Sequence, residues 1–113
     1  MHFDVVFHFD QDAAQLEFVL SNITNYTNGL PNEDFTTVLV VNGPGITCMG
    51  RDGEHAARIT TLAARGLSVR VCRNAMRHFD MPAESLHPAC QVVPAGVIEL
   101  VNLQRAGFAY IKP

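Results

Sequence analysis

The sequence lacks the segments that place a protein in or across a membrane. No apolar run reaches the roughly 18 residues that a spanning helix needs, and no charged and apolar leader precedes the first strand-like segment. Basic residues are also few and dispersed: eight Lys and Arg stand against eleven Asp and Glu, for a formal net charge of −3. Nucleic acids are bound by concentrated Lys and Arg. We therefore expect a soluble cytoplasmic protein with no membrane and no nucleic-acid partner.

Cysteine is scarce, and the common motifs for metals and nucleotides are missing. Cys48, Cys72 and Cys90 form an odd count without a CxxC pair, which argues against a secreted disulfide framework and leaves the thiols free in a reducing compartment. The five histidines have no spacing typical of a zinc site. Neither the dinucleotide-binding glycine loop, the P-loop nor the nucleophile elbow of α/β-hydrolases occurs. We expect no metal, no cofactor and no serine nucleophile.

Strand-like and helical segments alternate along the 113 residues with short connections. This alternation predicts an α/β fold, a three-layer α/β/α sandwich with a mainly parallel sheet. The length suits one domain, residues 1–113, and is too short for two. We expect strands at 3–9, 38–41, 67–72, 90–93 and 108–111, helices at 13–28, 52–66, 74–79 and 96–107, and a helical turn at 83–86.

Two of the predicted strands differ in how completely they should be covered. Residues 38–41 are all apolar, which is typical of a central strand with helices on both faces. In 67–72 the apolar residues alternate with Ser68, Arg70 and Cys72, which indicates one less covered face. We expect that strand at a sheet edge or a subunit contact, where Arg70 pairs with an acid across the interface.

Cys72 stands where a predicted strand turns into a short helix. The carboxyl ends of parallel strands line the crevice where α/β proteins bind ligands, so segments 8–10, 42–48, 72–74 and 94–96 should share one rim. A thiol at a helix N-terminus there is favoured as the thiolate. Most unpaired cysteines are instead small buried hydrophobes, and the residues alone leave both interpretations open.

The other candidate site residues lie on the same rim. Asn42, Gly43 and Gly45 belong to a loop whose free N–H groups could cradle an anion or a persulfide sulfur, although tight turns need glycines for their own sake. Arg73 and Asn74 follow Cys72 directly, and Arg73 would favour its thiolate.

Further side chains could assist a thiol on this rim. Cys48 is a possible second thiol, and His8 or His55 could approach the rim. Cys90 begins a strand, at the other end of the sheet, and we expect it to be structural.

The helix at 96–107 is apolar over more than one stripe, since it contains Val97, Ile98, Leu100, Val101 and Leu103. We expect a homo-oligomer in which this face is buried between subunits. The alternative is that the extra apolar residues pack against the sheet and the last strand of the same chain.

Three stretches carry a resemblance to a known family. They are Val40-Val41-Asn42-Gly43, the strand from Gly66 to Cys72 with its Cys72-Arg73-Asn74-Ala75-Met76 turn, and the terminal stretch from Val92 to Pro113. The chain resembles the DsrE/DsrF-like family of small α/β proteins, whose better-known members act in intracellular sulfur oxidation and sulfur relay. The resemblance implies a five-stranded parallel sheet, a trimer or hexamer, and Cys72 at the position of the sulfur-carrying cysteine.

Three functions follow as hypotheses. In the first, Cys72 carries persulfide sulfur between donor and acceptor proteins. In the second, the protein is a non-catalytic oligomeric binding module for a small anion or a protein partner, and Cys72 is structural. In the third, Cys48 and Cys72 form a disulfide under mild oxidant and act as a redox sensor.

Overall fold

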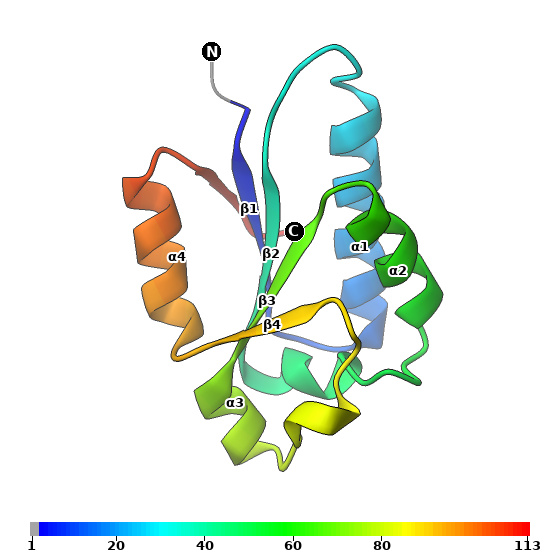
Figure 1. Ribbon diagram of the computed structural model, residues 1–113, viewed down its shortest axis with the longest axis vertical. Helices are drawn as coiled ribbons and strands as arrows, with labels where there is room; N and C mark the ends of the chain where they lie inside the picture. The colour runs from blue at the N-terminus through cyan, green and yellow to red at the C-terminus, as the bar shows by residue number, and fades with distance from the viewer. Residues whose placement is uncertain (1–2) are drawn as a thin grey trace.

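Five parallel strands form one sheet in the order β4-β3-β2-β1-β5. The computed structural model describes residues 3–113 (Figure 1). The strands are β1 Val5–Phe9, β2 Thr37–Val41, β3 Ser68–Cys72, β4 Cys90–Val93 and β5 Ala109–Ile111. Because every pairing is parallel, all five strands end at the same side of the sheet. The predicted α/β sandwich with a parallel sheet is confirmed.

Helices cover the two faces of the sheet unequally. On one face lie α1 Ala13–Asn28 and α2 Ala56–Ala64, and on the other lies α4 Gly96–Arg105 (Figure 1). The short helix α3 Arg73–His78 and two 3-10 helices, η1 Gly43–Cys48 and η2 Ala83–Ser85, lie toward the carboxyl ends of the strands (Figure 1). Within residues 3–113, the helices are too short or too polar for any of them to cross a bilayer.

Local chemistry sets the helix ends. The Asp12 carboxylate accepts a hydrogen bond from the Gln15 backbone N–H at 2.9 Å and caps α1. Gly66 adopts φ +107 just beyond α2, a backbone conformation that glycine tolerates best. Helix α2 begins four residues later than predicted, because residues 52–55 form turns in which the Gly53 N–H bonds to Gly50 O at 3.0 Å.

The core is divided by the sheet. The larger cluster contains Phe7, Phe9 and Leu39 and packs under α1 and α2. The smaller cluster lies under α4 and consists of Val6, Val38, Val40, Leu100 and Leu103, with the partly buried Phe108 against it. Successive residues of β1 and β2 therefore enter opposite clusters, as the period of a strand requires. Strand β2 is buried along its whole length and is the middle strand, which confirms its predicted central place.

The expectation that residues 67–72 form an edge strand is wrong. Strand β3 lies between β2 and β4. The Arg70 guanidinium donates to the Glu99 carboxylate of α4 at 2.7 Å, and both side chains are partly buried. Arg70 therefore pairs within its own chain, and the polar face of β3 is covered. Alternation reports which residues share a face, but it does not report what covers that face.

The Arg70–Glu99 pair should contribute measurably to stability. We expect Glu99→Gln to lower the free energy of unfolding by about 1 kcal/mol, because it leaves a partly buried guanidinium without its charged partner. Urea unfolding measures the change. Glu17→Gln is the matched control, since Glu17 lies 3.8 Å from Arg58 in an exposed pair and should change the free energy of unfolding by less than about 0.5 kcal/mol. Equal losses in the two variants would contradict the assignment.

Candidate functional site

Cys72 is the last residue of β3 and the residue before α3. Its backbone is extended, with φ −75 and ψ 120, and the helix turns away directly after it. The residue is 6% exposed and borders Ala75 and Met76 in the larger core cluster. No side chain caps the α3 N-terminus, so its first N–H groups are left without an intrahelical or side-chain acceptor. The thiol thus lies at a strand end with little solvent contact.

Asn42 and Gly96 converge on Cys72 from two other connections. Asn42 follows Val41, which is paired with Val71, so Asn42 is beside Cys72 across the β2–β3 ladder. A Cβ built on Gly96 would be 3.0 Å from Asn42 Cβ and 3.3 Å from Cys72 Cβ. Only glycine therefore permits this approach of α4 without a shift. Three of the segments predicted to share a rim meet at this point.

The start of α4 brings a second helix N-terminus to the thiol. Helix α4 has ten residues and begins at Gly96, and its N-terminus is not capped by a side chain. Backbone N–H groups and the positive end of a helix dipole favour a nearby anion. Sequence reasoning included Gly96 in the rim but not among the binding residues. The sequence feature that could have identified Gly96 was a glycine shortly after Pro94, at the start of a predicted helix.

A hydrogen-bond network reaches Asn42 from the opposite side. His8 Nε2 lies 2.7 Å from Asn42 Oδ1, and His8 Nδ1 lies 2.6 Å from the Tyr110 hydroxyl. His8 is 8% exposed. His8 was expected near the rim, whereas Tyr110 was not, because β5 joins β1 only in the folded chain. His55 is not part of this network, since its Nε2 bonds to Ala13 O at 3.0 Å.

The glycines of the 42–45 segment are accounted for by backbone geometry and packing. Gly43 has φ +54, which favours glycine. A Cβ on Gly45 would be 3.0 Å from the Phe9 ring and 3.1 Å from Asp10 Cα. The segment enters η1 directly after Asn42. These contacts are those of a tight, well-packed turn.

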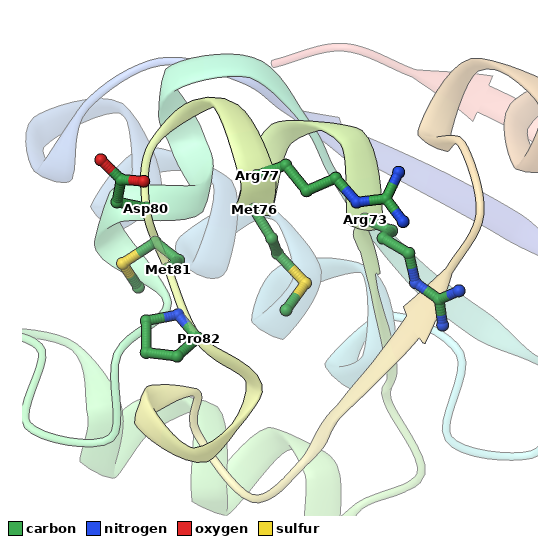
Figure 2. A pocket seen from close by; sticks show the side chains of 6 residues that line it. All are labelled: Arg73, Met76, Arg77, Asp80, Met81 and Pro82. Carbon is green, nitrogen blue, oxygen red and sulfur yellow. The ribbon is translucent and has the colours of Figure 1, made fainter.

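Arg73 and Asn74 are exposed on the first turn of α3. Arg73 lines a cavity of about 460 Å³ together with Met76, Arg77, Asp80, Met81 and Pro82. The Arg73 and Arg77 guanidinium groups lie at one end of this cavity and Asp80 at the other (Figure 2). The cavity is a cationic groove on the outer face of α3. One of its lining residues, Arg73, directly follows Cys72.

The other two cysteines have different surroundings. Cys48 is half-buried in η1, and burial raises the pKa of its thiol, an effect that Asp12 and Glu54 reinforce and a hydrogen bond with Thr47 opposes. Cys90 pairs with Val69 at the amino end of the ladder in which Cys72 pairs with Val93. Burial raises the pKa of Cys90 to about 11. All three cysteines are free thiols.

The DsrE/DsrF-like family model matches residues 1–113. The chain belongs to the DsrE/DsrF-like family. The family predicted from the sequence is therefore confirmed. Among solved structures, the chain is similar to MTH1491, a protein of unknown function from Methanobacterium thermoautotrophicum, with 29% identity, a TM-score of 0.91, and coverage of 98% of this chain and 99% of that one.

No curated protein matches this member of the DsrE/DsrF-like family. Across residues 3–113, no three His, Cys, Asp or Glu side chains are grouped so that they could hold a metal ion. The site therefore contains the Cys72 thiol, the N-termini of α3 and α4, which no side chain caps, and the Asn42 side chain.

The raised pKa of Cys90 should make it slow to alkylate in the folded protein. Burial disfavours the thiolate, and the thiolate is the nucleophile. At pH 8 we expect iodoacetamide to modify Cys90 on the order of a hundredfold more slowly in the folded than in the urea-unfolded chain. Cys48 should be slowed in the same direction. Peptide mapping by mass spectrometry gives both rates, and an unchanged Cys90 rate would show that its thiol is accessible.

Proposed function

We propose that the protein carries sulfane sulfur as a persulfide on Cys72, between sulfur donor and acceptor proteins in the cytoplasm. The observation that carries the proposal is the packing of Gly96, the first residue of α4, against Cys72 and Asn42. This packing brings a second uncapped helix start to a thiol that already precedes α3. Membership of the DsrE/DsrF-like family supports a sulfur-relay type of function.

The proposed step is a thiol exchange in which no external oxidant is needed. The Cys72 thiolate attacks the terminal sulfur of a donor persulfide, R–S–SH. The sulfur–sulfur bond of the donor breaks, a new one forms at Cys72, and R–S⁻ leaves with the electron pair. The product is Cys72–S–SH. An acceptor thiolate then takes the terminal sulfur by the same exchange and regenerates the Cys72 thiolate.

The surroundings of Cys72 suit an anionic sulfur that must be protected. Its charge is favoured by the N–H groups and dipoles at the starts of α3 and α4. Arg73, the next residue, adds an exposed positive charge that would attract an anionic donor. Cys72 is 6% exposed, and such burial limits the access of oxidants to a persulfide formed there.

A donor experiment tests the proposal. Incubation of the reduced protein with a low-molecular-weight persulfide should add about 32 Da to its intact mass, and dithiothreitol should remove the added sulfur. Cys72→Ser should abolish the adduct. Cys48→Ser and Cys90→Ser are the matched controls and should retain it. Absence of the adduct from wild type, or its retention in Cys72→Ser, would refute the proposal.

The second candidate function is a non-catalytic binding module. The observation in its favour is the burial of Cys72 against Ala75 and Met76, which a structural cysteine would also have. In that case the rim or the groove beside α3 binds a small anion or a protein partner. Failure of Cys72 both to gain sulfur and to react with iodoacetamide without denaturant would favour this candidate.

We also propose that the chain forms a homo-oligomer, a trimer or hexamer, through the outer face of α4. Val97, Ile98 and Val101 on this face are 60%, 59% and 51% exposed, and Tyr110 on the neighbouring edge strand is 40% exposed. Apolar side chains grouped in this way are typical of a protein–protein interface. A second copy of the chain is the occupant that the family resemblance favours.

A charge placed in this face should dissociate the oligomer. We expect Val101→Glu to sediment at the mass of one chain at concentrations where wild type sediments as a multiple of it, because a carboxylate buried in an apolar interface is strongly unfavourable. Phe18→Glu is the control: Phe18 is 57% exposed on α1, on the other side of the sheet, and its substitution should leave the assembly intact. A monomeric wild type, or dissociation by Phe18→Glu alone, would contradict the proposal.

A further inference from the structure

Three polar side chains form a line across the α4 face of the sheet. They are Tyr110 on β5, His8 on β1 and Asn42 at the end of β2. Each step goes to the neighbouring strand and two residues further along it, since Tyr110 is paired with Val6 and His8 with Val40. Side chains two residues apart on a strand share a face. The line therefore runs diagonally toward the carboxyl ends of the strands.

The line ends beside Cys72. Asn42 and Cys72 directly follow the paired residues Val41 and Val71. Their Cβ atoms both lie within 3.3 Å of the position that a Gly96 Cβ would occupy. Cys72 is two residues beyond Arg70, which bonds to Glu99 of α4, so its Cβ also leaves the strand on the α4 face. Because Cys72 is the last residue of β3, it also belongs to the larger cluster, which includes Ala75 and Met76 of α3. The Cβ atoms of Asn42 and Cys72 thus lie side by side next to the start of α4.

The hydrogen bonds fix the orientation of the Asn42 amide. Asn42 Oδ1 is an acceptor only, so His8 Nε2 carries a proton and donates to it at 2.7 Å. In the neutral imidazole Nδ1 is then an acceptor, and it receives the Tyr110 hydroxyl proton at 2.6 Å. With Oδ1 engaged by His8, the two Nδ2 protons of Asn42 point away from the histidine. Within residues 3–113 no protein acceptor bonds to Asn42 Nδ2.

We infer that Asn42 Nδ2 donates a hydrogen bond to the sulfur anion of Cys72, and that His8 and Tyr110 are positioning residues that hold Asn42 in the orientation to do so. This inference rests on the proposed function, because the anion is the thiolate or persulfide of Cys72. The starts of α3 and α4 supply backbone N–H groups. Asn42 would add a side-chain donor, and the hydrogen bonds of His8 and Tyr110 set its direction.

Burial of the Tyr110–His8–Asn42 network costs free energy, which indicates that the network has a role beyond packing. His8 is 8% exposed, and the apolar strand residues on its face are Val6, Val38 and Val40. Burying an imidazole among valines costs free energy unless both ring nitrogens find partners. An apolar residue would fill this place with no such requirement. The two partners that His8 does have come from strands on either side of β1.

The test is the rate at which iodoacetamide alkylates Cys72 at pH 7, followed by peptide mapping. Asn42→Ala removes the donor and should slow the reaction about tenfold, as expected for loss of a hydrogen bond to a charged group. His8→Leu should slow it to a similar degree, and Tyr110→Phe by a few-fold. His8→Gln should restore the rate to within about twofold of wild type, because its amide N–H can still donate to Asn42 Oδ1.

Tyr26→Phe is the matched control, since its hydroxyl donates to Phe3 O at 2.6 Å from α1, on the opposite side of the sheet. It should leave the rate unchanged. Wild-type rates in Asn42→Ala would overturn the inference, and so would a slow His8→Gln or a wild-type Cys72 that does not react. Asn42 and Tyr110 are accessible to solvent, so their variants give a result even if His8→Leu does not fold. The donor experiment, which measures sulfur uptake by the wild-type protein, tests the proposed function separately from this inference.

Discussion

The close approach of α4 to the ends of β2 and β3 is the contact on which the site depends. Gly96 permits it, because any side chain there would meet Asn42 and Cys72 at 3.0 and 3.3 Å. A parallel sheet gathers its strand ends on one side, but gathering alone leaves a shallow rim. Here α4, which runs back across the sheet, covers part of that rim with its first residue. Its uncapped N-terminus, the start of α3 and Asn42 then lie beside Cys72.

The two faces of the sheet are covered unequally. Helices α1 and α2 bury one face in the larger core. Helix α4 alone covers the other face, over a smaller core. The Arg70–Glu99 pair and the Tyr110–His8–Asn42 network both lie on that second face. The same single helix presents Val97, Ile98 and Val101 to the outside, so the thinly covered face holds both the site and the apolar surface.

The three thiols show how position within one sheet changes the chemistry of one residue type. Cys90 lies at the amino end of β4, and burial, opposed by a backbone hydrogen bond at His87, raises its pKa to about 11. Cys48 is half-buried near two carboxylates, which also oppose ionisation and raise its pKa. Cys72 is the thiol at the carboxyl end, where helix starts meet. The direction of the strands, which the chain connectivity dictates, places Cys72 and Cys90 at opposite ends of the β3–β4 ladder.

The sequence by itself determined the α/β fold class, the family, the central place of residues 38–41 and the sharing of one rim by Asn42 and Cys72. The fold class, the central strand and the shared rim follow from periodicity and connection length, which are local properties, whereas the family follows from the resemblance of three stretches to known members. Only the tertiary structure decided that β3 is an inner strand, because β4 pairs with its second edge. Its polar face is covered by Glu99, 29 residues from Arg70 along the chain. The contact of His8 with Tyr110 spans 102 residues. Such contacts depend on strand order and register, and no local pattern encodes which strands become neighbours.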